Sequence, residues 1–303
     1  MRALTDLPAP AKLNVFLRVV GRRSDGYHLL QSLFVLLDWH DTLHLEVRND
    51  GQIRRHDLGL ALPADDLCLR AARLLQPHSR ESMGVDISVN KVLPSGAGLG
   101  GGSSDAATVL MGLNRLWNLN WSRSRLAELG LKLGADVPFF LGGGSAIVEG
   151  IGERLTPVDV RSRGYLVVKP PVGVSTQTIF RDPHLTRDSR AAIVEGFLAD
   201  PSIMDAMLDG RTTGEGFRAC NDLQAVAIGH APEIGEVVDW LSARWGNGQM
   251  TGSGSAVFAR ETVANAPLMA TASGQRLLQA KPDQWEARWC RSLVQHPLVQ
   301  RLG

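Results

Sequence analysis

Cysteine is scarce in this sequence, with Cys68, Cys220 and Cys290 spread far apart over 303 residues. An odd number of distant cysteines without a CxxC pair indicates neither a disulfide framework nor a zinc site. No apolar run approaches the roughly 18 residues that cross a bilayer, and the first residues show no signal-peptide segment. These absences favour a reducing, cytoplasmic setting and no membrane partner.

Neither sign of charge dominates the chain, whose formal net charge is +1 with 21% charged residues. Without a basic excess, nothing in the composition points to a nucleic-acid partner. The hydrophobic content of 44% fits a soluble globular enzyme. At this length the chain can bury a substantial core, and two domains are a natural expectation.

Glycine, in contrast, is concentrated in one stretch, PSGAGLGGGSSDAA at residues 94–107, and an apolar run typical of a helix follows at once. Glycines let backbone N–H groups converge on an anion, and a helix start adds free N–H groups at the positive end of its dipole. Ser103 and Ser104 fit the N-cap and first turn of that helix. The stretch therefore predicts a phosphate cradle, with a flexible glycine-rich turn as the alternative.

Two common kinds of phosphate loop do not fit the context. Gly96, Gly98 and Gly101 match the dinucleotide pattern GxGxxG, but that fold needs a strand directly before the loop and an acidic residue about 20 residues later. The P-loop needs Gly-Lys-Ser/Thr, whereas here the glycines lead to Ser-Ser-Asp. Lys91, Pro94 and Ser95 also separate the glycine run from the strand-like VDISVN at residues 85–90.

Alternation and helical spacing predict strands and helices that do not strictly alternate, which is typical of an α+β fold. The expected strands lie at residues 11–20, 30–39, 41–50, 85–93 and 165–169, with a strand pair at 145–155. The expected helices lie at residues 65–75, 106–117 and 122–133, and two more, broken at residues 229–232, lie within 220–246.

Polar residues in two short segments are candidates for chemistry. Asp136 in LGADVPFF suits a helix N-cap with Pro138 in the first turn, or a catalytic carboxylate. Lys12 in PAKLN could be a solvated surface lysine, the commoner fate of this residue type, or a functional cation. Asn14 follows two residues later, so it would share a strand face with Lys12.

Two further segments each allow two interpretations. Tyr27 and His28 follow a turn at Gly26 and could stack on and hydrogen-bond a heterocycle, or close a hairpin as half-buried aromatics. The Gly252-Ser-Gly254-Ser255 segment could be a second phosphate-approach loop or a tight turn.

Together these motifs resemble the GHMP kinase superfamily, which includes galactokinase, homoserine kinase and mevalonate kinase. The segments that carry this resemblance are PAKLN at residues 10–14, PSGAGLGGGSS at 94–104 and TGSGSA at 251–256. RSDGYHL at residues 23–29 resembles the superfamily members that phosphorylate 4-diphosphocytidyl-2-C-methyl-D-erythritol. GADVPFFL, GVST and NDL at residues 221–223 follow in the same order, so the resemblance covers nearly the whole chain.

The resemblance implies a two-domain GHMP kinase fold with the active site in the cleft between the domains. Residues 1–160 would form the ATP-binding, ribosomal-protein-S5-like α/β domain. Residues 161–303 would form the ferredoxin-like α+β domain.

The activity that the resemblance implies is transfer of the ATP γ-phosphoryl group to the 2-hydroxyl of this CDP-alcohol, in non-mevalonate isoprenoid biosynthesis. Asp136 would take the hydroxyl proton, and Lys12 would keep Asp136 ionised and steady the developing charge. Mg²⁺ is expected with ATP, and Ser103 or Ser104 is the candidate protein ligand.

The resemblance also places residues at the two substrates. The residues expected at ATP are Lys91, Pro94, Gly96, Gly98, Leu99, Gly100, Gly101, Gly102, Ser103 and Ser104, with Asp66 and Leu67 near the adenine. The residues expected at the CDP-alcohol are Asn14, Tyr27, His28, Thr176 and Phe180. Many relatives have Asn where this chain has Asp66, so the base contacts there are expected to differ.

Alternatives to this activity are another GHMP kinase acting on homoserine or mevalonate, and a nucleotide-binding relative without catalysis. The RSDGYHL segment favours the CDP-alcohol over the first, and Lys12, Asp136 and the intact glycine loop favour activity over the second. The expected partners are ATP and the CDP-alcohol, and the chain is expected to be a monomer or homodimer.

Overall fold

The computed structural model describes residues 2–80, 83–189, 191, 201–209, 212–213, 217–261 and 272–302. Its strands are β1 (Ala3–Arg22), β2 (His28–Arg48), β3 (Ile53–Asp57), β4 (Gly84–Asn90), β5 (Ala146–Gly150), β6 (Arg154–Pro157), β7 (Gly164–Lys169), β8 (Gln249–Met250), β9 (Val257–Arg260) and β10 (Glu286–Leu293). Its α-helices are α1 (Leu67–Leu75), α2 (Gly101–Leu116), α3 (Arg123–Gly130), α4 (Val137–Gly142), α5 (Thr176–Arg181), α7 (Pro201–Leu208), α8 (Gln224–His230), α9 (Pro232–Trp245), α11 (Ala272–Gln279) and α12 (Leu298–Leu302), and a short 3₁₀ helix spans Gln76–His78.

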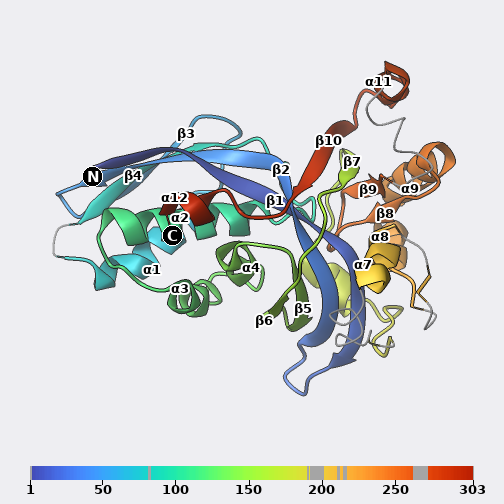
Figure 1. Ribbon diagram of the computed structural model, residues 1–303, viewed down its shortest axis with the longest axis horizontal. Helices are drawn as coiled ribbons and strands as arrows, with labels where there is room; N and C mark the ends of the chain where they lie inside the picture. Colours follow the sequence, from blue (N-terminus) through green and yellow to red (C-terminus); the bar gives the residue numbers. More distant parts are fainter. Residues whose placement is uncertain are drawn as a thin grey trace.

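The antiparallel pair β1 and β2 runs through the molecule and holds its two ends together (Figure 1). The sequence predicts two strands at residues 30–39 and 41–50, but the structure has the single strand β2. Asp41, in the middle of it, does not end the strand, because its buried carboxylate accepts hydrogen bonds from Val92 N and Leu93 N at 2.6 and 2.7 Å. A polar residue with satisfied hydrogen bonds can stay inside a strand at little cost.

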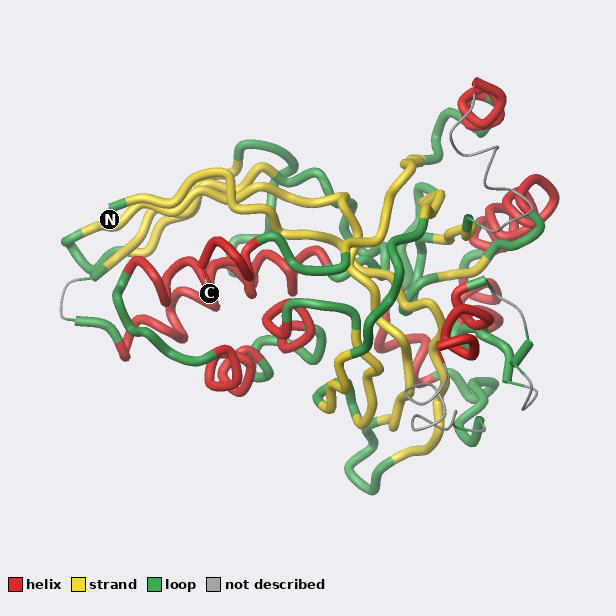
Figure 2. The backbone as a smooth tube through the Cα atoms, in the orientation of Figure 1, coloured by secondary structure: helices red, strands yellow, loops and turns green. Residues whose placement is uncertain are grey.

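Strands from both halves of the chain join one ten-stranded sheet, in the order β3-β4-β2-β10-β7-β9-β8 with β1, β5 and β6 beside β2. Helices α1, α2 and α3 cover one face at the end formed by β1 to β4, as Figure 2 shows in red against yellow. The core there lies between these helices and apolar residues of β2 and β4. At the other end, α8 and α9 pack with β7 and β9 around a second core.

The mixed order of strands and helices confirms the α+β expectation. The boundary between residues 160 and 161 stays a prediction, and the expected second domain includes ranges outside the described residues. Among the described residues, no helix has the length and apolar content that a membrane span requires.

Candidate active site

The glycine loop connects β4 to α2 and forms the centre of the site. Gly96, Gly98 and Gly100 have φ values of +62°, +73° and +71°, a left-handed conformation that costs glycine little and other residues more. Gly100 is the N-cap of α2, so the expectation that Ser103 or Ser104 fills the N-cap is wrong, and both lie in the first turn. The loop needs positive φ at this position, which favours Gly over Ser.

Backbone hydrogen bonds join this loop to two other segments that the sequence singled out. Leu99 O accepts from Lys12 N at 2.9 Å, which attaches the loop to the PAKLN segment. Gly96 O and Ala97 O accept from Ser255 N and Ala256 N, each at 3.1 Å, which attaches it to the second glycine turn. The three motifs are 80 or more residues apart in sequence and meet in space.

Gly98 lies where the two glycine turns touch, so we expect Gly98→Ala to lower ATP affinity strongly. A Cβ at this position would lie 2.2 Å from Thr251 O, and both turns would have to separate. Gly96→Ala is the matched control, since Gly96 has a similar φ but a Cβ there meets nothing within 4 Å. Nucleotide titrations of both variants test this, and equal losses of affinity would show that backbone strain alone matters.

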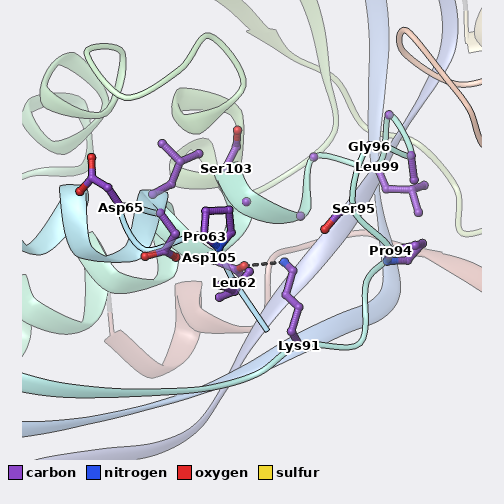
Figure 3. A pocket seen from close by; sticks show the side chains of 17 residues that line it. Leu62, Pro63, Asp65, Lys91, Pro94, Ser95, Gly96, Leu99, Ser103 and Asp105 are labelled. Atoms are coloured by element: carbon purple, nitrogen blue, oxygen red, sulfur yellow. Dashed lines mark hydrogen bonds and ion pairs between the residues drawn. The ribbon is translucent and has the colours of Figure 1, made fainter. Parts of the chain in front are cut away.

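A cavity of about 460 Å³ lies on one side of the glycine loop (Figure 3). Its walls include most of the residues expected at ATP, namely Lys91, Pro94, Gly96, Gly98, Leu99, Gly100, Gly101, Gly102, Ser103, Asp66 and Leu67. Ser104 is absent from these walls, and its hydroxyl is buried without a hydrogen-bond partner among the described residues. Leu62 and Pro63, which the sequence did not single out, close the far side.

Lys91 lies beneath the loop between two buried carboxylates, and Figure 3 shows its side chain extended toward Asp105. Its Nζ is 2.5 Å from both Asp41 Oδ2 and Asp105 Oδ2. Burial opposes a charge on Lys91, but the carboxylates of Asp105 and Asp41 outweigh it and raise the lysine pKa. Burial raises the pKa of Asp105 to about 7, since it outweighs the neighbouring ammonium of Lys91, and the charge of Asp41 adds to the rise. Lys91 therefore links the start of the glycine loop to β2 through Asp41 and to α2 through Asp105.

Asp66 caps α1, with its carboxylate accepting from Cys68 N and Leu69 N. It also pairs with Arg55 Nη1 at 2.8 Å. Both oxygens of Asp66 therefore already have partners at the edge of the cavity. An adenine contact at this position would have to share them, whereas the neighbouring Leu67 offers the cavity an apolar surface.

Lys12, Asn14 and Asp136 form a polar cluster on the other side of the loop. Lys12 is buried, which excludes the alternative of a solvated surface lysine. Its Nζ lies 2.5 Å from Asn14 Oδ1 and 3.4 Å from Asp136 Oδ2, and it also lies 4.5 Å from the centre of the Phe34 ring. The β1–β2 register shifts just before Lys12 and just after Asn14, and such irregularities re-aim side chains near active sites.

Asp136 occupies the N-cap position of α4 but makes no capping hydrogen bond with its side chain. Its side chain is 31% exposed, and it borders a second cavity of about 240 Å³. The carboxylate is therefore available to accept a proton beside a fixed ammonium group. This is the arrangement that a general base requires.

Gly96, Gly98 and Gly100 line both cavities, so the glycine loop is their shared wall. The walls of the smaller cavity include Lys12, Asn14, Ser32, Phe34, Asp136, Thr176, Phe180 and the second glycine turn. Thr176 Oγ1 lies 2.6 Å from Ser253 Oγ, which connects α5 to that turn. Asn221 supports the same turn, since its Nδ2 donates to Met250 O and Gly252 O at 2.8 Å.

Tyr27 and His28 differ in position. Tyr27 lies after the turn at residues 24–26 and is 61% exposed, outside the walls of either cavity. The His28 ring packs against Phe180, with ring centres 5.0 Å apart and planes 31° apart. Through Phe180, the His28 ring adjoins the smaller cavity.

Sequence reasoning missed Asp41, Asp105 and Arg187. Asp41 lies between His40 and Thr42, and Asp105 follows the two serines of the glycine stretch, so neither position carries a sequence signal of a buried, paired carboxylate. Arg187 has no sequence signal either, since its partners come from β2 and α5 and only the folded chain brings them together.

The chain is similar to known proteins over its whole length. A model of the GHMP kinases N terminal domain matches residues 66–144, which include the glycine loop, α2 and Asp136. The 4-diphosphocytidyl-2-C-methyl-D-erythritol kinase of Methylibium petroleiphilum is 53% identical over 303 residues, or 100% of this chain and 99% of that protein. The Variovorax paradoxus protein of the same name is 50% identical over 98% of each chain.

Solved structures show the same relationship. A crystal structure of a 4-(cytidine 5'-diphospho)-2C-methyl-D-erythritol kinase superposes with a TM-score of 0.74 at 34% identity, covering 94% of this chain and 98% of the other. The Methanococcus jannaschii mevalonate kinase, at 15% identity and a TM-score of 0.63, shares the fold. Fold and site thus define a GHMP-type kinase. Within that class, the chain belongs to the family of 4-diphosphocytidyl-2-C-methyl-D-erythritol kinases.

Proposed function

We propose that the protein transfers the γ-phosphoryl group of ATP to the 2-hydroxyl of 4-diphosphocytidyl-2-C-methyl-D-erythritol, giving the 2-phosphate and ADP. This places it in non-mevalonate isoprenoid precursor biosynthesis. The observation that carries the proposal is the glycine loop shared by two cavities, with the Lys12–Asp136 pair on the wall of the smaller one. ATP in the larger cavity and an alcohol in the smaller one would meet across that loop.

The reaction needs one proton acceptor and a site that stabilises charge. Asp136 takes the proton of the hydroxyl, the alcohol oxygen forms a bond to the γ-phosphorus, and the bond from that phosphorus to the bridging oxygen of ADP breaks. Lys12 holds the carboxylate in place and offsets the negative charge that develops on the phosphoryl oxygens. The backbone N–H groups of the glycine loop and the N-terminus of α2 hold the phosphates.

Mg²⁺ would be held mainly by the ATP phosphates. Among the described residues, no group of three or more His, Cys, Asp or Glu side chains forms a metal cage. The donors present fit Mg²⁺, which usually binds one or two protein ligands plus substrate phosphates. Ser103 lines the cavity proposed for ATP, and its Oγ lies near Gly134, two residues before Asp136. We therefore propose the Ser103 hydroxyl as the protein ligand of Mg²⁺. The ion would supply charge neutralisation on the phosphates.

An ADP-release assay tests the activity directly. The CDP-alcohol, homoserine and mevalonate are offered separately with ATP and Mg²⁺, and turnover is expected with the CDP-alcohol alone. Turnover of homoserine or mevalonate with no inhibition by cytidine nucleotides would identify a different GHMP kinase. ATP binding without turnover of any alcohol would identify a relative without catalysis. The cytoplasmic location and the monomeric or homodimeric state remain predictions from the sequence.

A further inference from the structure

Arg187 lies outside both cavities, yet its guanidinium contacts Phe180 in the wall of the smaller one and three residues outside that wall. Its Nε donates to His28 Nε2 at 3.1 Å, where β2 begins. Its Nη2 donates to Phe180 O at 3.2 Å and Asp182 O at 2.6 Å, at the end of α5. Its Nη1 donates to Leu185 O at 2.9 Å. One side chain therefore fixes the end of α5 against the start of β2.

The contact with His28 has a chemical consequence, because a guanidinium has only donors and stays protonated in proteins. The Nε2 atom of His28 must accept, so it carries no proton. The neutral ring then carries its proton on Nδ1, and within the described part of the chain Nδ1 has no hydrogen-bond partner.

The charge state of His28 follows from the same neighbours. Burial lowers the pKa of His28, and the positive charges of Arg187 and of Arg22, at the end of β1, lower it further. At neutral pH the ring is therefore a neutral imidazole with a single donor. The ring of Phe180, 5.0 Å away, holds the plane of that imidazole from the α5 side.

We propose that Arg187 is a positioning residue that fixes His28 as the Nδ1–H tautomer and thereby makes the site prefer cytosine over uracil. A fixed hydrogen-bond donor suits the Watson–Crick edge of cytosine, where N3 and O2 are both acceptors. Uracil carries a proton on N3, so a donor aimed at that atom is left unpaired, which sites built on hydrogen bonds discriminate against strongly. The inference rests on the proposed function for its substrate class.

The first test measures the tautomer in the unmodified protein. Long-range ¹⁵N NMR of protein with labelled histidine, with the His28 signal assigned through a His28→Gln variant, reports which ring nitrogen is protonated. We expect protonation at Nδ1 in the wild type and loss of this fixed state in Arg187→Gln. Protonation at Nε2 in the wild type would overturn the inference, whatever the enzyme's substrate is.

The second test measures selectivity, with Arg161→Gln as the matched control because Arg161 is exposed and lines neither cavity. In Arg187→Gln we expect KM for the CDP-alcohol to rise about tenfold, the cost of one or two hydrogen bonds, with kcat and KM for ATP nearly unchanged. The preference for CMP over UMP as competitive inhibitors should fall by a similar factor.

An unchanged CMP/UMP ratio in Arg187→Gln would overturn the inference. So would a parallel loss of kcat, ATP affinity and thermal stability, since that pattern means a purely structural role. If the wild-type enzyme did not phosphorylate the CDP-alcohol at all, the proposed function would fail instead. The NMR measurement would still show which ring nitrogen of His28 carries the proton, and whether Arg187 fixes it there.

Discussion

Asp136→Asn is expected to lower kcat for phosphoryl transfer by about 10²–10⁴-fold, the usual contribution of a general base. Asparagine keeps the shape of the side chain but does not take up a proton at neutral pH. The fold should survive, because Asp136 makes no capping hydrogen bond and Lys12 keeps its 2.5 Å contact with Asn14. Single-turnover ADP formation, measured beside ATP affinity, separates the chemical step from binding.

The matched control for Asp136 is Asp159→Asn, which makes the same chemical change at an exposed site. It should leave kcat within about twofold of the wild type, as surface substitutions usually do. ATP affinity should change little in Asp136→Asn. Wild-type kcat in Asp136→Asn would show that another group accepts the proton and would remove the base assignment.

Lys91→Met is expected to give the largest loss of stability among these variants, about 3–5 kcal/mol, because it leaves two buried carboxylates without their shared cation. Asp41 keeps its bonds to the backbone of residues 92 and 93, but Asp105 loses the single opposite charge that it pairs with among the described residues. Urea unfolding measures the loss. Lys132→Met, at an exposed lysine, is the control and should change stability by at most about 0.5 kcal/mol. Equal stability of Lys91→Met and the wild type would show that the ion pairs of Lys91 contribute nothing to the free energy of unfolding.

Asp105→Asn isolates the second carboxylate of that cluster. The pKa of Asp105 is raised in the folded protein from 3.8 to about 7, chiefly by burial, so the folded state favours the protonated form. The stability from this group is full below its unfolded pKa and is lost as the pH rises toward about 7. Wild-type stability relative to Asp105→Asn should therefore fall between about pH 4 and pH 7. Thermal melts across that range test this, and a constant difference would contradict the raised pKa.

Local patterns account for much of the fold. Alternation and helical spacing locate β4, α1 and α3 to within a few residues, because each element buries one periodic face. The expected strand at residues 11–20 lies within β1, which begins earlier, at Ala3. Asp66 and Ser122 cap α1 and α3 through bonds to backbone N–H groups only two or three residues away. Such features depend on near neighbours, so the sequence contains them. The single strand β2 was not predicted, because the partners of Asp41 lie some fifty residues further along.

The site residues likewise divide into those that the sequence identified and those whose contacts only the structure shows. The glycine loop, Lys12, Asn14 and Asp136 could be named from the sequence, because their residue types and order resemble one family of kinases. Tertiary structure alone decided that Lys12 is buried beside Asp136 and that Lys91 supports the loop between two carboxylates. It also decided that Arg187 holds His28 against Phe180.

Whether a feature can be predicted from the sequence depends on how far apart in the chain the residues that create it lie. A motif such as the stretch at residues 94–107 predicts phosphate binding by itself, because positive φ and a helix N-terminus are local properties. Burial, charge pairing and the tautomer of a histidine depend on groups far away in the sequence, such as His28 and Arg187, which are 159 residues apart. The sequence thus predicted a phosphate site and indicated the family to which the chain belongs, and the fold decided which side chains are buried, paired and exposed.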